Sequence, residues 1–145
     1  GWILRNQRSN RMDNYTDEEL SEALREVSST ISKCEKMQGK FAEGTAQYSL
    51  LRNRIKAMVI SKLLIESELS HKEQMTDDLG QYTKAELTEA LRPVVSVISK
   101  CEKAQMKFAE GSSHYRRLEN LVKAMEIARA LIEAPLALDR INANG

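Results

Sequence analysis

Residues that interrupt helices are scarce in this sequence: its 145 residues include only two prolines and six glycines. Both residue types disfavour the interior of a helix, so long stretches of the chain are free to be helical. Two cysteines are too few for a disulfide framework, so we expect a reducing, cytoplasmic environment. No run approaches the roughly 20 consecutive apolar residues of a membrane span, and the first residues lack the long apolar region of a secretory signal.

An excess of charge of one sign is also lacking. The 22 lysines and arginines nearly balance the 21 aspartates and glutamates, which leaves a net charge of +1. This balance argues against a protein whose main work is to hold phosphate backbones by bulk electrostatics.

His71 and His114 do not occupy equivalent positions, and Cys34 and Cys101 lack a Cys-x-x-Cys partner. We therefore expect no metal, cofactor or catalytic site, and we interpret both cysteines as small buried hydrophobes.

An internal repeat organises the chain. Residues 15–69 align without a gap on residues 82–136, with identity at 33 of the 55 positions. The shared blocks include Ile-Ser-Lys-Cys-Glu-Lys and Lys-Phe-Ala-Glu-Gly. We predict two repeats, 15–69 and 82–136, separated by a linker (70–81), preceded by an arm that is flexible or tag-derived (1–14) and followed by a tail (137–145).

Each repeat is predicted to begin with a capped helix. Thr16 and Glu19 form a Thr-x-x-Glu capping box, which Thr83 and Glu86 repeat; the hydroxyl and the carboxylate each satisfy an orphan amide. Apolar residues then recur at helical spacing on one face: Leu20, Leu24, Val27, Ile31, Cys34 and Phe41. Pro93 interrupts this pattern in the second repeat, and we expect it to kink the helix rather than break it.

Glycine and proline predict where the helices end. Gly44 and Gly111 are expected to end the first helix of each repeat, after about 25 residues, as left-handed caps. The next residue, Thr45 or Ser112, can cap a second helix, so each repeat is predicted to be a tight helical hairpin. Pro135 is expected to stop the last helix.

The second helix of each repeat carries two apolar stripes, and a helix with two apolar faces must be covered twice. One stripe is expected to close the hairpin: Tyr48, Leu51, Ile55, Met58, Ile65 and Leu69. The other is expected to meet the second hairpin: Ala57, Ile60 and Leu64, with Ala124, Ile127 and Leu131 as equivalents. We therefore predict an all-α protein in which a tandem-duplicated helical hairpin forms a four-helix bundle. The second helices would pack on each other, so that the two repeats form a pseudo-dimer. Association of whole chains into a further homo-oligomer is compatible with this arrangement.

Two glutamines, Gln38 and Gln105, fall near the middle of the apolar face, where a buried amide must find partners. Because they lie close to the end of the helix, we favour the interpretation that they fix the register between helices. The alternative is a small polar pocket formed with Tyr48 and Tyr115, which would make the protein a small-ligand binder.

An apolar pair provides a candidate partner surface. Val59 and Leu63 fall between the two stripes, and their equivalents in the second repeat, Glu126 and Ala130, are polar or small. An exposed apolar pair of this kind tends to mark a contact with another chain. A wider core contact in the first repeat is the alternative explanation.

Lysines recur opposite the apolar face of the first helices: Lys33, Lys36, Lys40, Lys100, Lys103 and Lys107. Together with Arg52, Arg54 and the arginines of the N-terminal arm, they support an alternative function in nucleic-acid binding. Glutamates share the same neighbourhood, however, and no aromatic residues interleave for base stacking. We favour a solvated face that complements the helix dipole.

The run Tyr-Thr-x-x-Glu-Leu-x-Glu-Ala-Leu, followed by Lys-Cys-Glu-Lys-x-Gln-x-Lys and a Gly-Thr turn, resembles small, uncharacterised helical-hairpin proteins of Gram-positive bacteria. The resemblance spans each repeat; it is compatible with a cytoplasmic location and implies no activity. We predict a non-catalytic protein–protein interaction or scaffold module that does not enter a membrane. A nucleic-acid-associated regulator is the first alternative, and a small-ligand binder is the second.

Overall fold

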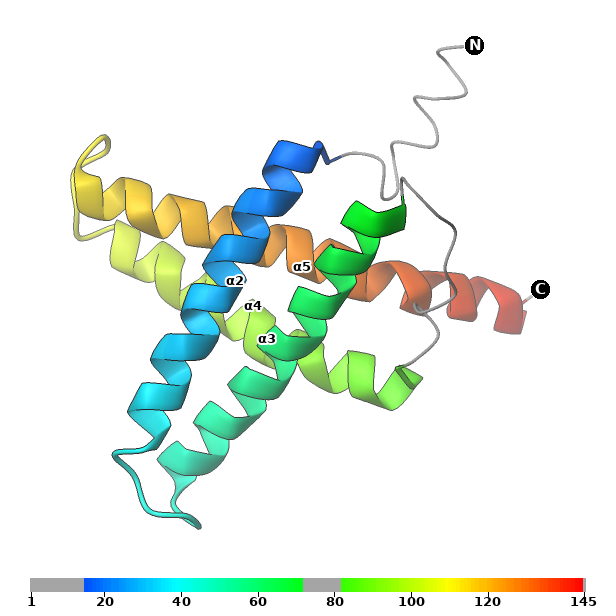
Figure 1. Ribbon diagram of the computed structural model, residues 1–145, viewed down its shortest axis with the longest axis horizontal. Helices are drawn as coiled ribbons and strands as arrows, with labels where there is room; N and C mark the ends of the chain where they lie inside the picture. The colour runs from blue at the N-terminus through cyan, green and yellow to red at the C-terminus, as the bar shows by residue number, and fades with distance from the viewer. Residues whose placement is uncertain (1–14, 72–81, 145) are drawn as a thin grey trace.

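The computed structural model describes residues 15–71 and 82–144, and within these residues it contains four α-helices and no strand. The helices are α2 (Asp17–Gln38), α3 (Ala46–His71), α4 (Lys84–Gln105) and α5 (Ser113–Asn144). α2 pairs with α3 and α4 with α5, and one hairpin lies across the other in a second layer (Figure 1). The prediction of an all-helical, bundle-like protein is confirmed. The predictions for the arm (1–14) and for 72–81 of the linker lie outside the described residues.

The predicted capping boxes begin α2 and α4. The Thr16 hydroxyl accepts a hydrogen bond from the Glu19 amide at 3.0 Å, and the Glu19 carboxylate accepts one from the Thr16 amide at 2.9 Å. Thr83 and Glu86 repeat both bonds, at 3.0 and 2.8 Å. Each box satisfies two of the four amides that a helix start leaves free, which fixes the point where the chain enters the helix.

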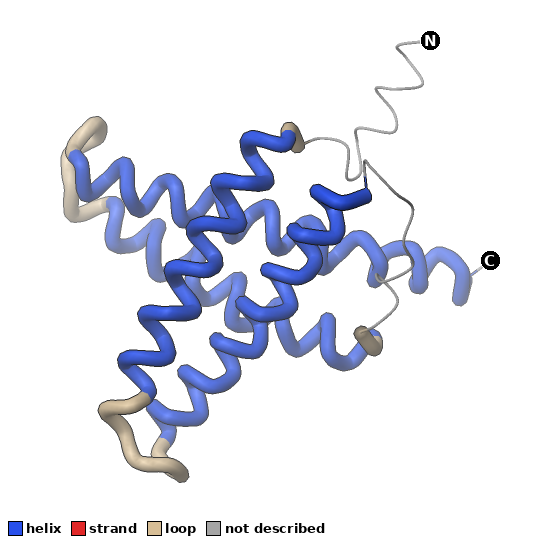
Figure 2. Tube along the Cα trace, in the orientation of Figure 1, coloured by secondary structure: helices blue, strands red, loops and turns tan. Residues whose placement is uncertain are grey.

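The predicted ends of the first helices are wrong. α2 ends at Gln38 and α4 at Gln105, well before Gly44 and Gly111. The amide of Lys40 bonds to the carbonyl of Met37, three residues back, so the chain tightens and leaves the helix. Loops therefore form the tips of both hairpins (Figure 2).

Both glycines nevertheless adopt the left-handed conformation, with φ of 94° at Gly44 and 86° at Gly111. They lie in the loops, directly before the residues that cap the second helices. The Thr45 hydroxyl accepts from the Tyr48 amide and the Ser112 hydroxyl accepts from the Tyr115 amide, both at 3.2 Å. The glycines thus precede the N-caps of the second helices and do not end the first helices.

Both prolines lie inside helices. α4 runs through Pro93 as a single helix, as predicted. The prediction that Pro135 stops the last helix is wrong, because α5 continues to Asn144. An interior proline costs a helix about 3 kcal/mol. Ile132 is fully buried and Leu136 packs against the core, so packing on both sides of Pro135 offsets this cost.

Equivalent positions of the two hairpins build the core. The pairs that are fully or almost fully buried include Leu20 and Leu87, Val27 and Val94, Met58 and Met125, and Ile65 and Ile132. The stripe predicted to join the hairpins is also part of this core: Ala57, Leu64, Ala124, Ile127 and Leu131 are buried, and Ile60 is half-buried against them.

The second helices, α3 and α5, touch each other, but they are not each other's main partners. α3 contacts α4 and α5 contacts α2 more extensively. The crossed arrangement explains this difference from the prediction, because each second helix lies across both helices of the other hairpin (Figure 1).

Candidate functional site

Two open grooves lie where the hairpins cross. We call them the α3/α4 groove, of about 510 Å³, and the α2/α5 groove, of about 540 Å³. Small apolar residues line both: Ala57, Ile60 and Ala90 in the α3/α4 groove, and Ala124, Ile127 and Ala23 in the α2/α5 groove. These sets occupy equivalent positions of the repeats. The grooves are therefore two versions of one surface feature.

The charged residues around the two grooves differ. The α2/α5 groove is strongly acidic: its charged lining consists of Glu18, Glu19, Glu22, Glu26, Glu126 and Lys123. The lining of the α3/α4 groove is mixed, with Arg54, Lys56 and Arg92 against Glu86 and Glu89. The difference arises where the repeats diverge, because the equivalents of Glu18, Glu26 and Glu126 are Ala85, Pro93 and Val59.

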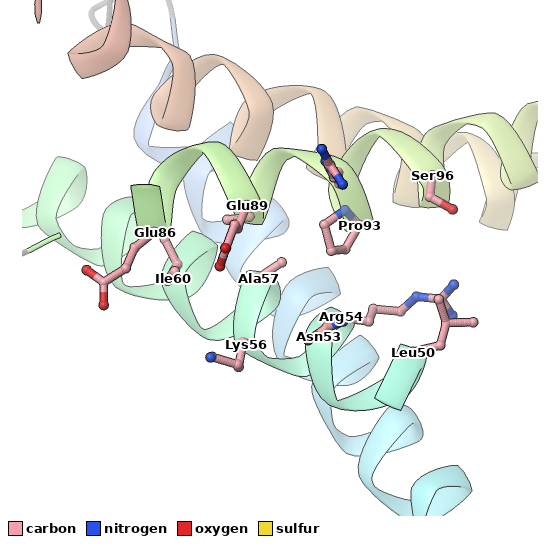
Figure 3. A pocket seen from close by; sticks show the side chains of 12 residues that line it. Leu50, Asn53, Arg54, Lys56, Ala57, Ile60, Glu86, Glu89, Pro93 and Ser96 are labelled. Atoms are coloured by element: carbon pink, nitrogen blue, oxygen red, sulfur yellow. The ribbon is translucent and has the colours of Figure 1, made fainter. Parts of the chain in front are cut away.

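Arg54 distinguishes the α3/α4 groove most clearly. Its side chain is partly buried, and its Nε atom is inaccessible and has no hydrogen-bond partner. Among the described residues no carboxylate forms an ion pair with it. The side chain extends from α3 toward the end of the groove where Leu50 and Ser96 lie, away from Glu86 (Figure 3).

The two cysteines lie close to Arg54. Cys34 and Cys101 are free thiols, only 5% and 7% exposed. Burial raises the pKa of both thiols. The Arg54 guanidinium opposes this rise at both sites by its charge, and at Cys34 also by hydrogen bonding. The net rise in pKa keeps both groups protonated at neutral pH, so they are poor nucleophiles and poor metal ligands.

Gln38 and Gln105 connect the helices of each hairpin. The side-chain amide of Gln38 donates to the Tyr48 carbonyl at 3.4 Å, and that of Gln105 donates to the Tyr115 carbonyl at 3.3 Å. Each glutamine is the last residue of its helix and reaches the first turn of the next one. The geometry agrees with a role in fixing the register of the hairpin.

Val59 and Leu63 are each 39% exposed on α3. They lie one helical turn apart, next to Lys56 and Ile60, which line the α3/α4 groove.

The lysines of the first helices are exposed as well. His114 stacks on Phe108 in the tip of the second hairpin, with ring centroids 4.9 Å apart, a contact that the sequence analysis did not identify.

The sequence analysis assigned Arg54 only to a possible nucleic-acid surface and did not place it in a groove. The alignment of the repeats marks this position as divergent, because Leu121 is the equivalent of Arg54. The position can therefore be apolar in this fold. Its place in the groove could not be predicted, because arginine is usually a surface residue and the groove forms only where the hairpins cross.

No group of three potential metal ligands occurs in the part of the chain that the structure describes. None of its helices in that part has the length and apolar character needed to cross a bilayer. No family model, curated protein or solved structure matches the chain.

Proposed function

We propose that this chain is a non-catalytic protein-interaction module and that α3 carries its partner-binding surface. The observation behind this proposal is the exposure of Val59 and Leu63, at 39% each. The fold does not require apolar residues there, since Glu126 and Ala130 hold the equivalent positions on α5. Unlike a single exposed apolar residue, two such side chains one helical turn apart that the fold does not need form a patch, and this supports a contact with another molecule.

The surroundings of this pair indicate the kind of partner. Val59 and Leu63 border the apolar floor of the α3/α4 groove through Ile60 and Ala57. A ridge of apolar side chains could cover the pair and enter the groove at the same time. An amphipathic helix of another protein presents such a ridge, with anchors at helical spacing. We therefore infer an apolar helix face as the partner's contact surface.

The internal repeat supplies the variants for a test. Val59→Glu with Leu63→Ala installs the residues of α5, so the fold should tolerate both changes. Val95→Ser is a matched control, because Val95 is 42% exposed on α4 and its equivalent is Ser28. Proteins retained from a lysate of the source cells should be compared by quantitative mass spectrometry, and the best candidate titrated against all three proteins. We expect the double variant to bind about ten-fold more weakly or worse, and the control to bind as the unaltered chain does.

Equal binding by the double variant and the unaltered chain would contradict the proposal. Retention of nucleic acid in place of protein, lost as the salt concentration rises, would favour the alternative function of the exposed lysines.

We also infer that the two hairpins arose by tandem duplication. Identity at 33 of 55 aligned positions supports this inference. Matched capping boxes, left-handed glycines and glutamine–tyrosine hydrogen bonds support it as well. The divergent positions then become informative, because they show what changed after the copies separated.

A further inference from the structure

The α3/α4 groove is lined by a guanidinium, Arg54, that forms no ion pair with a described residue. Arg54 is partly buried, its Nε donor has no acceptor, and no described carboxylate pairs with it. Partly buried charges in proteins are normally paired, since removal of an ion from water is costly. The neighbouring thiol of Cys34 is a neutral, weak acceptor and does not balance the charge. Arg54 therefore has no charged partner among the described residues.

We propose that the α3/α4 groove binds a small ligand through an oxyanion, a carboxylate or a phosphate group, held by Arg54. This proposal does not depend on the protein-interaction function; because both occupants would use the groove floor at Ala57 and Ile60, they would exclude each other. Guanidinium groups present paired donors that match both anions. The groove volume of about 510 Å³ lies within the range of small-molecule sites, roughly 300 to 1,000 Å³.

The polar residues of the groove are arranged along its length. Ser96 and Leu50 lie at the end toward which Arg54 extends, and Glu86 lies at the opposite end beside Ile60 (Figure 3). Arg92, which also lines the groove, adds a second guanidinium. An anion is therefore expected at the Arg54 end, with the rest of the ligand over the apolar floor and toward Glu86 and Glu89.

Leu121 shows that the fold does not need the charge of Arg54. It occupies the equivalent position on α5 and packs against the core. The α2/α5 groove, whose described lining is acidic and contains no arginine, should bind no anion. The chain thus contains its own negative control.

The test uses the full chain and its ¹H–¹⁵N spectrum, in which the arginine Nε–H groups are observed directly. Inorganic phosphate and succinate are titrated separately, with sodium chloride at equal ionic strength as the control. We expect a saturable shift of the Arg54 Nε–H signal and of the backbone amides of Asn53 and Ser96. Saturation by phosphate alone assigns a phosphate-bearing ligand, and saturation by succinate alone assigns a carboxylate; saturation by both supports an oxyanion site of either kind.

Two variants complete the experiment. Arg54→Leu, which copies Leu121, should weaken binding about ten-fold or more, because a charged hydrogen-bonding partner is lost. Arg92→Ala changes an exposed residue and should weaken binding without affecting folding, which keeps the test valid if Arg54→Leu fails to fold. Shifts that chloride reproduces, that survive Arg54→Leu in a folded protein, or that fail to saturate would overturn the proposal. The absence of any shift would overturn it too.

Discussion

At the scale of single residues, burial determines the chemistry of the two cysteines. Position on an apolar stripe correctly predicted that Cys34 and Cys101 are buried. Their proximity to Arg54 could not be predicted, because Arg54 comes from α3 and its charge reaches thiols on both α2 and α4. Such a contact depends on how the hairpins cross, which the helical periodicity of one hairpin does not specify.

The raised thiol pKa values predict how stability depends on pH. A thiol that is harder to ionise in the folded state contributes stability that is fully present below the unfolded pKa of about 8.5. This contribution is lost as the pH rises from there through the folded pKa. We expect the free energy of unfolding to fall between pH 8 and 10, and to fall less in a Cys34→Ala, Cys101→Ala double variant. Urea unfolding under reducing conditions across this range measures how the free energy of unfolding changes with pH in both proteins. The same pH dependence in both would refute the prediction.

Gln38 provides a second prediction for a single side chain. Its amide donates to the Tyr48 carbonyl and links α2 to α3. Loss of such a neutral hydrogen bond typically costs about 1 kcal/mol, so Gln38→Ala should lower the free energy of unfolding by about that amount. Gln47→Ala is a suitable control, because Gln47 is exposed in the first turn of α3. An equal effect of both substitutions in urea unfolding would argue against a role for the Gln38 bond.

At the scale of helices, the sequence predicted the starts better than the ends. A start depends on short-range chemistry, and the Thr16 and Glu19 capping box is visible in four consecutive residues. At the end of α2 the backbone tightens at Lys40, and the Gln38 side chain bonds to Tyr48, ten residues away. The end of α5 depends on whether packing can hold the helix beyond Pro135. Local signals alone specify neither end.

Pro93 is the clearest local conflict within a helix. It has no amide hydrogen to donate to the Glu89 carbonyl in α4. Pro93→Ala restores this donor and removes the steric conflict, so we expect it to raise the free energy of unfolding, by up to about 3 kcal/mol. Thermal or urea unfolding measures the change, with Glu26→Ala at the equivalent position of α2 as the control. A loss of stability would mean that the backbone around Pro93 is adapted to the proline.

At the scale of the whole molecule, the repeat predicted the composition of the core but not its geometry. The residues assigned to the joining stripe are buried or half-buried at the centre, Ala57 and Ala124 among them. The sequence also suggested that the hairpins would meet mainly through α3 and α5, whereas between the hairpins each of these helices contacts the first helix of the other hairpin more extensively. Apolar stripes identify which faces are covered. They do not determine the crossing angle, which depends on how side chains interdigitate over all four helices.

The crossed arrangement leads to a prediction about why the chain contains two hairpins. One hairpin of 55 residues is near the lower size limit for an independent core, and alone it would expose Ala57 and Leu64, which the second hairpin helps to bury. Two identical hairpins related by a two-fold axis could cover these residues mutually, as in an isologous dimer. We therefore expect an isolated fragment, residues 15–69, to form a homodimer resembling the full chain.

Ile60→Asp should weaken this dimer, because the carboxylate would be desolvated against the core without a partner. Val59→Asp is the matched control, since Val59 lies beside Ile60 on α3 but is 39% exposed. Sedimentation equilibrium of the three fragments at micromolar concentration measures the association directly. The expected order is a dimer for the unaltered fragment and for Val59→Asp, and a shift toward monomer for Ile60→Asp. A stably folded monomer that is indifferent to Ile60→Asp would show that one hairpin covers its own apolar stripe, and the second repeat would then need an explanation other than stability.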